Sequence, residues 1–200
     1  MDVVENAQFE VVPATSEGWP DVRTLFSGHG ELGCWCQYWR KPSSEYRRGG
    51  PDLGEEGLRR QVMEDPPPGM LAYVADEPAG WLGLWPRERL ERLARSRTIP
   101  KIDDRPVWAI VCFMVRVGYR RKGVARALLH GAIDYARDRG VPALEAYPID
   151  PQGGRIDVAF GYVGFTPMFE AAGFRRIVET AARSARRPRI LMRLELEEGA

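Results

Sequence analysis

The stretch that decides the fold is VRVGYRRKGVA, at residues 115–125. A nearly unbroken apolar run at 107–115 leads into it, and such a run predicts a strand that is buried on both faces. Residues 123–139 follow with apolar side chains at helical spacing, which predicts an amphipathic helix. The three consecutive basic residues of the stretch therefore lie at a turn between a buried strand and a helix.

A basic turn that leads into a helix is suited to binding an anion. The backbone N–H groups of the first helical turn have no partner within the helix and attract negative charge. Gly123 has no Cβ and lets the backbone approach a ligand closely, while Arg120, Arg121 and Lys122 add positive charge. The combination suits a pyrophosphate, with a solvated basic turn as the alternative. The stretch has neither the P-loop spacing nor that of the dinucleotide fingerprint.

Shorter elements are predicted on both sides of this unit. The strand, helix, strand order of residues 107–147 predicts a parallel crossover within a mixed sheet. Residues 41–57 are rich in Pro, Gly, Ser and charge, which predicts a flexible loop. No second domain boundary is visible, so we expect a single domain over residues 1–200. The further predicted strands are 9–12, 70–75, 79–85, 143–147, 174–180 and 190–196, and the further predicted helices are 21–26, 58–63, 86–97 and 166–172.

The composition argues against several classes of protein. The formal net charge is +1, from 29 Lys and Arg against 28 Asp and Glu, so we expect binding to neither nucleic acid nor a membrane surface. No apolar run is long enough to span a bilayer, and residues 1–10 lack the basic start and apolar stretch of a signal peptide. The three cysteines, an odd count, favour a reducing compartment over a disulfide framework. We therefore expect a cytoplasmic protein.

Residues 115–125 resemble motif A of the GNAT acetyltransferases, which reads Arg/Gln-x-x-Gly-x-Gly/Ala after a strand. Arg120, Gly123 and Ala125 match this pattern. The sequence FEAAGF at 169–174 resembles the end of the family's last helix, which often has an aromatic residue, Glu, two further residues, Gly and Phe. The order of the predicted elements over residues 70–196 is similar to that of the family as well.

The resemblance implies an α/β (α+β) fold with a mixed, mostly antiparallel and strongly twisted sheet, flanked by helices, whose two central parallel strands splay apart. Acetyl-CoA would enter this opening as the co-substrate, without a metal. The implied activity is acetyl transfer to a primary amine of a small molecule or protein. The alternative is a non-catalytic acyl-CoA-binding or regulatory module on the same fold.

The resemblance also implies which residues hold acetyl-CoA. The backbone of residues 113–115 would hold the pantetheine arm, with the N–H of Val115 toward the thioester oxygen. The N–H groups of residues 121–125 would hold the pyrophosphate. The residues implied in this way are Phe113, Met114, Val115, Arg120, Arg121, Lys122, Gly123, Val124 and Ala125.

Candidate acid and base residues lie after the motif helix. Alternation places Glu145 and Tyr147 on the strand face opposite the helix, toward the acceptor. Glu145 is a candidate base, with a hydrogen-bonded strand carboxylate as the alternative. Many family members place a tyrosine just before Glu-x-x-Gly-Phe, where it can protonate the departing thiolate, but this chain has Phe169 there. We expect Tyr147 or Tyr162 to substitute, unless the thiolate leaves unprotonated or the chain does not catalyse.

An aromatic group precedes the 41–57 segment. Trp35, Tyr38 and Trp39 are predicted to form a wall of the acceptor site, because the N-terminal region often does so in the family. Core packing is the alternative. An aromatic wall would suit an apolar or cationic acceptor.

Three cysteines and a histidine raise the question of a metal site. Cys34, Cys36, Cys112 and His29 are the residues concerned, but the Cys-x-Cys spacing is tighter than that of a zinc knuckle and no second pair follows. We therefore expect no metal, and thiols that behave as small buried side chains.

A basic run separates the last two predicted strands. Arg183, Arg186, Arg187 and Arg189 are predicted to form a solvated hairpin tip, with nucleic-acid contact as the alternative. The sequence leaves open the identity of the acceptor amine, the acyl chain and whether the chain forms a homodimer.

Overall fold

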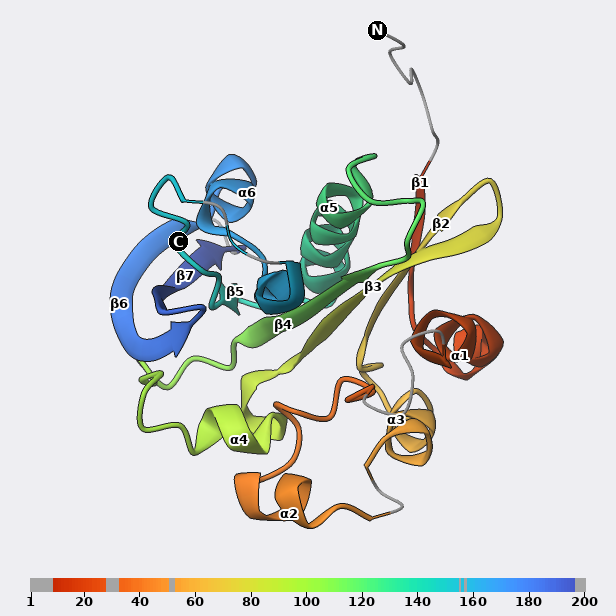
Figure 1. Ribbon diagram of the computed structural model, residues 1–200, viewed down its shortest axis with the longest axis horizontal. Helices are drawn as coiled ribbons and strands as arrows, with labels where there is room; N and C mark the ends of the chain where they lie inside the picture. Colours follow the sequence, from red (N-terminus) through yellow and green to blue (C-terminus); the bar gives the residue numbers. More distant parts are fainter. Residues whose placement is uncertain (1–8, 28–32, 51–52, 155, 157, 197–200) are drawn as a thin grey trace, which may run out of the picture.

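A twisted seven-stranded sheet forms the centre of the molecule, with the strand order β1-β2-β3-β4-β5-β7-β6 (Figure 1). The structure is a computed structural model that describes residues 9–27, 33–50, 53–154, 156 and 158–196. Within these residues β4 and β5 are the one parallel pair, and all other neighbouring strands are antiparallel. The predicted mixed, mostly antiparallel sheet is confirmed. The strands are β1 Phe9–Pro13, β2 Gly69–Val74, β3 Glu77–Pro86, β4 Trp108–Val115, β5 Ala143–Ala146, β6 Arg175–Ser184 and β7 Arg187–Glu195.

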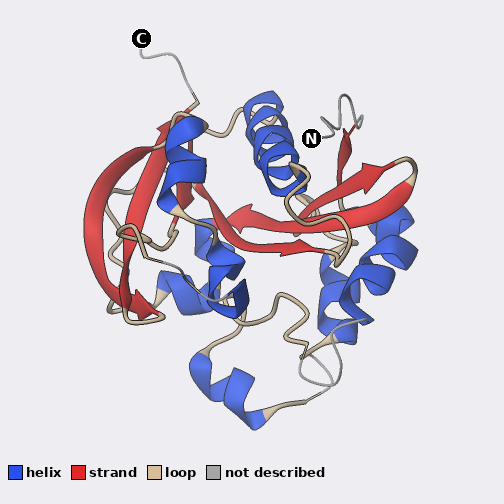
Figure 2. Cartoon of the chain, turned by 45° about the horizontal axis from the view of Figure 1, so that its top comes forward, coloured by secondary structure: helices blue, strands red, loops and turns tan. Residues whose placement is uncertain are grey.

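Helices cover both faces of the sheet (Figure 2). Two of them, α5 and α6, lie on one side, and α1 to α4 lie on the other (Figure 1). The α-helices are α1 Trp19–Ser27, α2 Ser43–Arg48, α3 Glu55–Gln61, α4 Glu91–Ala94, α5 Val124–Asp138 and α6 Thr166–Ala171. Short 3-10 helices are η1 Ser16–Gly18, η2 Arg87–Arg89 and η3 Val158–Val163. None of the described helices has the length and apolar character that crossing a membrane requires.

The apolar stripe of α5 packs on the sheet because its apolar residues recur at helical spacing. Its buried residues are Val124, Leu128, Leu129, Ala132, Ile133 and Ala136. They share one core cluster with alternate residues of β2 and β3, such as Met70 and Leu82. Gly80 of β3 permits the close approach, since a Cβ there would lie 2.8 Å from Val124 Cγ1. This packing fixes where the first turn of α5 lies relative to β4.

The opposite face of the sheet carries two further apolar clusters. Near β2 and β3, α1 packs around Trp81 and Leu71, which alternate with the residues that face α5. Near β4 and β5, Leu93 of α4 and the neighbouring Leu90 pack on Val111. The segment that joins β3 to β4 is therefore held against the sheet beside the carboxyl end of β5.

The prediction of an unstructured loop at residues 41–57 is wrong in part, because this range contains α2 and the beginning of α3. Overall, residues 41–57 have loop composition, but SSEYRR at 43–48 contains neither Pro nor Gly, and Pro42 and Gly49 bound it as helix caps. Tyr46 packs edge-on against Tyr38, with ring centroids 5.6 Å apart. Residues 51–52 lie outside the described part, and the flexibility of the segment stays a prediction.

Candidate active site

The two central parallel strands diverge. Three residue pairs join β4 to β5, and the last of them is Ile110 with Ala146. Beyond it, β4 continues to Val115 with β3 as its partner, whereas β5 ends. The chain after β5 turns toward the other half of the sheet, where Ile149 forms isolated bridges with Phe165 and Arg189. One edge of residues 111–115 is therefore left without a β5 partner, which opens the sheet beside the end of β4.

The turn between β4 and α5 brings backbone and positive charge to this opening. Gly118, Arg121 and Gly123 have φ angles of +94°, +61° and +95°. These left-handed conformations fold the chain tightly before α5, and two of the three positions are glycine, which adopts them at little cost. No side chain caps the beginning of α5. The first N–H groups of the helix are therefore available to an anion.

The basic side chains of the turn surround this helix end. Arg120, Arg121 and Lys122 are all exposed. Arg120 Nε donates a hydrogen bond to the carbonyl oxygen of Val115, 3.1 Å away, which ties the turn to the end of β4. The nine residues predicted to bind acetyl-CoA therefore follow one continuous path, from the unpaired edge of β4 through the basic turn to the uncapped start of α5.

Glu145 is the centre of a buried ion-pair network. Its side chain is 1% exposed. Arg193 Nη2 lies 2.7 Å from Oε1, and Arg87 Nε lies 3.2 Å from Oε2. Arg193 also pairs with Asp103. Both carboxylate oxygens are thus held by guanidinium groups, which favours the structural alternative, a hydrogen-bonded strand carboxylate, over a free general base.

Tyr147 belongs to the same network. It is 1% exposed, and its hydroxyl donates to Glu145 Oε2 at 2.6 Å and accepts from Arg87 Nε at 3.2 Å. Burial, followed by the charge of Glu145, raises the pKa of Tyr147 well above its usual range. Glu145 and Tyr147 face away from α5 as alternation predicts, but Arg87 and Arg193 bind their polar atoms.

Tyr162 lies in a different environment. It belongs to η3, which packs against β4 (Figure 1). Tyr162 is partly exposed, and its side chain lies close enough to Arg189 for the two to interact electrostatically. Burial raises the pKa of Tyr162 to about 12, and the positive charge of Arg189 partly opposes this shift. At neutral pH its phenol is therefore protonated, and its raised pKa makes it a weaker acid than a free phenol.

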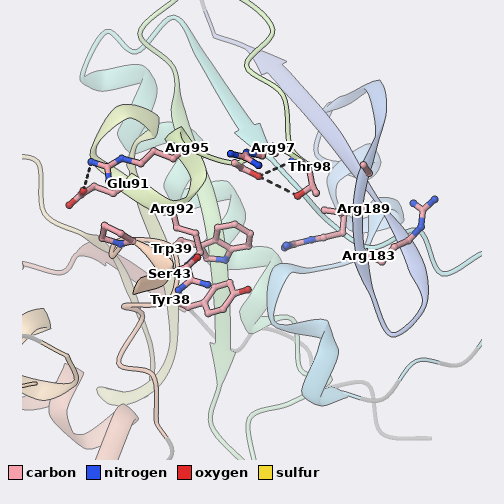
Figure 3. Close-up of a pocket in the computed structure, with 14 residues that line it drawn as sticks. Tyr38, Trp39, Ser43, Glu91, Arg92, Arg95, Arg97, Thr98, Arg183 and Arg189 are labelled. Carbon is pink, nitrogen blue, oxygen red and sulfur yellow. Dashed lines mark hydrogen bonds and ion pairs between the residues drawn. The ribbon is translucent and has the colours of Figure 1, made fainter. Parts of the chain in front are cut away.

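A pocket of about 480 Å³ opens on the same side of the sheet as η3, between the 38–43 segment, the α4 region and the β6–β7 hairpin (Figure 3). Arg189 connects it to the opening, because its Nε donates to the carbonyl oxygen of Tyr147, the first residue after β5, at 3.1 Å. Figure 3 shows the Arg189 side chain directed toward Trp39. The pocket is lined by Tyr38, Trp39, Pro42, Ser43, Glu91, Arg92, Arg95, Ser96, Arg97, Thr98, Ala181, Ala182, Arg183 and Arg189.

The predicted aromatic wall is divided between two places. Tyr38 and Trp39 line the pocket. Trp35 does not, because it stacks on Phe26 and Trp19 of α1, with ring centroids 5.2 Å and 6.2 Å away. The prediction for Trp35 gives way to its alternative, packing with the core.

Sequence reasoning missed Arg92, Arg95 and Arg97, which lie within six residues of the sequence and could have been noticed as a basic cluster. It also took Arg189 for part of a solvated hairpin tip, whereas this side chain is buried. The error arises because the sequence alone does not show that the β6–β7 hairpin folds toward α4.

The family model for the acetyltransferase (GNAT) family matches residues 33–162. The chain belongs to this family. The matched range contains the splayed β4 and β5, the basic turn, α5 and most of η3. GNAT proteins are acetyltransferases that use acetyl-CoA. A search of the curated proteins finds no match to this sequence.

Solved structures with the same fold include several GNAT enzymes. The ribosomal-protein-S18-alanine N-acetyltransferase of Escherichia coli is 14% identical with a TM-score of 0.55, over 96% of this chain and 97% of that one. A GCN5-related N-acetyltransferase of Kribbella flavida is 19% identical with a TM-score of 0.54, over 94% and 97%. The yncA protein of Salmonella typhimurium, solved with its cofactor acetyl-CoA, is 14% identical with a TM-score of 0.56, over 98% and 97%. At these identities the likeness shows the fold alone.

Phe169 occupies the place where many GNAT proteins have a tyrosine. Its ring is fully buried and lies edge-on to Phe113 and Phe174, with centroids 5.9 Å and 5.1 Å away. Gly164 allows this packing, since a Cβ there would lie 2.7 Å from Phe169 Cε2. The position therefore contributes apolar packing between α6 and β4 and has no proton to donate.

The thiols do not form a metal-binding group in the described residues, where no three His, Cys, Asp or Glu side chains are arranged to hold an ion. Cys36 and Cys112 both pack close to Gly83, where a Cβ would lie 2.8 Å from Cys36 Sγ and 3.3 Å from Cys112 Cβ. The side-chain hydrogen bond between them lowers the pKa of Cys36 and raises that of Cys112. His29 lies outside the described residues.

Proposed function

We propose that this chain transfers the acetyl group of acetyl-CoA to a primary amine of a small molecule or protein by direct attack on the thioester. The observation that carries the proposal is the continuity between the unpaired edge of β4 and the uncapped, basic start of α5. A GNAT chain with this path has a place for both the thioester and the pyrophosphate. The pocket across the sheet from α5 offers a separate approach for the amine.

The residues of the path would bind and polarise the co-substrate. When bound, acetyl-CoA supplies the activated acyl group. Backbone N–H groups at residues 121–125 would hold its pyrophosphate, and the N–H of Val115 would donate to the thioester oxygen, where negative charge develops. The amine nitrogen forms a bond to the acyl carbon, the carbon–sulfur bond breaks, and the amine gives up one proton. Holding both reactants in one opening removes much of the entropic barrier.

Tyr162 is our candidate for the acid that protonates the departing thiolate. Its phenol is protonated at neutral pH, and its hydroxyl interacts with Arg189 beside the opening. Tyr147 is less suited to this role, because its proton is held by Glu145. We assign no base to Glu145, whose oxygens are bound by Arg87 and Arg193. When a neutral amine attacks, its nitrogen becomes positively charged in the tetrahedral intermediate and would then lose its proton to water.

The test is release of free thiol from acetyl-CoA across a panel of primary amines, with acetylated product identified by mass spectrometry. We expect at least one amine to be acetylated, and the rate of thiol release should depend on the concentrations of both that amine and acetyl-CoA. Tight coenzyme A binding without turnover for any amine or protein N-terminus would contradict the proposal.

A second candidate function is that of a non-catalytic acyl-CoA-binding module, and Phe169 is the observation that favours it. The buried ring leaves the usual acid position of the family without a hydroxyl. Under this alternative coenzyme A and acetyl-CoA bind equally well, and the chain produces no acetylated amine. Binding measured by calorimetry beside the thiol-release assay separates the two functions.

A further inference from the structure

The pocket opposite α5 is strongly basic. Five of its lining residues are arginine, and Glu91 is its one carboxylate. Arg95 Nη2 lies 3.2 Å from Glu91 Oε2, so that carboxylate is already paired. Arg183 pairs outward with Glu179 at 3.3 Å. The remaining arginines, Arg92, Arg97 and Arg189, determine the charge that a ligand in the pocket would meet.

Two of these cations are partly or fully buried and have no carboxylate partner. Arg189 is 5% exposed, and Arg92 is partly buried. In the described part of the chain, no Asp or Glu oxygen lies within ion-pair distance of either one. Arg92 Nη2 has no hydrogen-bond partner there at all. Burying a guanidinium without a counter-ion costs free energy. An anion that entered the pocket would therefore be stabilised by the charges of both Arg92 and Arg189.

Aromatic rings hold the two guanidinium groups in place. Arg92 lies over Tyr38 at 4.1 Å and over Tyr46 at 5.1 Å, measured to the ring centroids. Arg189 lies over Trp39 at 4.9 Å. Because stacking orients each planar group, its N–H groups are fixed before a ligand arrives. Figure 3 shows Arg92 and Arg189 beside the rings of Tyr38 and Trp39, with Glu91 farther to the side.

We propose that the acceptor is an amine that also carries an oxyanion, a phosphate or a carboxylate, and that Arg92 and Arg189 bind this group. The inference rests on the proposed acetyl transfer and names its acceptor class. Arg189 is well placed for this role, because its Nε is bonded to the residue that directly follows β5. An acceptor held there by its anionic end has its amine free to reach the opening between β4 and β5.

The same charges disfavour a polycationic acceptor. A polyamine or an aminoglycoside would bring several positive charges against arginines that lack a free carboxylate partner. Like charges at close range repel most strongly where water is excluded. The aromatic residues alone would suggest a site for a cationic acceptor. Arg92 and Arg189 of the protein itself already lie over these rings, so the rings are not available to a cationic ligand.

The first experiment compares matched amine pairs in the thiol-release assay. Phosphoethanolamine with ethanolamine tests for a phosphate, and arginine with agmatine tests for a carboxylate. We expect the anionic member of at least one pair to have a kcat/KM about 10-fold to 100-fold higher, since charge-assisted hydrogen bonds are the strong ones. Equal or better use of ethanolamine and agmatine would overturn the inference while leaving acetyl transfer intact.

The second experiment needs no turnover. Inorganic phosphate is added at constant ionic strength to protein saturated with coenzyme A, so that the turn before α5 is already occupied. We expect phosphate to raise the melting temperature of the wild type and of Arg175→Gln, which removes the same charge from β6 outside the pocket. The increase should be absent in Arg92→Gln and Arg189→Gln. No increase in the wild type, or an equal increase in all variants, would overturn the inference.

Further variants keep the test valid if a buried substitution prevents folding. Arg97→Gln and Arg95→Gln change exposed residues of the pocket, and each should raise the KM for the anionic acceptor about 2-fold to 5-fold with kcat little changed. Arg189→Lys keeps the charge and should retain part of the phosphate effect. Phosphate binding in the pocket without acetyl transfer to any amine would instead contradict the proposed function and leave an anion site.

Discussion

Gly123 and Gly140 stand just before and just after α5, and both have positive φ angles, +95° and +66°. Replacing either with alanine forces a side chain into the left-handed region at a cost of about 1–2 kcal/mol. Only Gly123 lies on the proposed acetyl-CoA path. We therefore expect Gly123→Ala and Gly140→Ala to lower the melting temperature similarly.

Coenzyme A affinity should separate the two variants. We expect Gly123→Ala to weaken binding at least about 10-fold, because backbone N–H groups bind an anion only in one orientation. Gly140→Ala should bind as the wild type does. Isothermal calorimetry measures both, and equal affinities in the two variants would show that the turn does not hold the pyrophosphate.

The two candidate tyrosines differ in what each hydroxyl contacts. Tyr162→Phe removes the hydroxyl of a partly exposed residue, and we expect a loss of about 10-fold to 100-fold in kcat if this hydroxyl is the acid, with little change in stability. Tyr147→Phe leaves Glu145 and Arg87 each without one buried hydrogen bond, which should lower the free energy of unfolding by about 1–3 kcal/mol. The rate of acetyl transfer and the free energy of unfolding in urea are measured for both variants. An unchanged kcat in Tyr162→Phe would show that Tyr162 is not the acid and would favour a thiolate that leaves unprotonated.

At the scale of elements, Arg176 of β6 joins three parts of the chain. Its guanidinium bonds Asp150 Oδ2 at 2.6 Å, Glu170 Oε1 at 2.6 Å and Thr166 Oγ1 at 3.1 Å. It therefore ties α6 and the segment after β5 to the edge of the sheet. The Arg176 hydrogen bond lowers the pKa of Asp150 below its usual value.

This lowered pKa predicts a pH dependence of stability. A carboxyl whose pKa is lower in the folded protein stabilises it above the unfolded pKa of about 3.9, and the contribution is lost as the pH falls through the folded value. We expect Asp150→Asn to destabilise by about 1 kcal/mol at pH 7, a small figure because Arg176 is partly exposed, and by much less at pH 3. Asp134→Asn, which breaks an exposed pair on α5, is the control and should change little at either pH. The free energy of unfolding in urea is measured for both variants at both pH values, and an equal loss in Asp150→Asn at pH 7 and pH 3 would contradict the prediction.

Long periodic elements could be predicted from the sequence, whereas short ones could not. The strand β4 and the helix α5 have patterns that only one conformation satisfies, and their bounds differ from the prediction by a residue or so. The helix α2 has six residues and forms where local composition favours a loop, with Tyr46 packed against Tyr38 and Arg92. Such contacts are tertiary and leave no local pattern.

The same distinction applies to the site. The proposed acetyl-CoA path is contiguous in the chain, so one motif indicates it. The acceptor pocket is assembled from segments near Tyr38, Arg92 and Arg189, which are far apart in sequence. Alternation placed Glu145 on the correct face, but its partners Arg87 and Arg193 could be found only from the fold.

At the scale of the whole molecule, one continuous sheet runs from β1 to β6, so we infer a single domain over residues 1–200. Only three residue pairs join its two halves between β4 and β5. A ligand that fills the opening would contact both halves and stabilise the folded state. At a coenzyme A concentration 100 times its Kd, we expect the free energy of unfolding to increase by about 2.7 kcal/mol. This increase corresponds to a rise in melting temperature of about 5–10 °C. Calorimetry checks this, and Gly123→Ala should reduce the rise at the same concentration, whereas Gly140→Ala should not.

The position of β7 has a consequence for biosynthesis. This strand is the last of those described, yet it lies between β5 and β6, both of which are made before it. Once residues 175–184 have been made and before residues 187–195 follow, β5 and β6 have no neighbour to pair with on the sides that β7 will fill. Exposed strand edges invite pairing with other chains. The nascent protein is therefore most vulnerable to aggregation just before Arg187–Glu195 emerges, and slow translation of that short segment would lengthen the period in which a chaperone has to protect it.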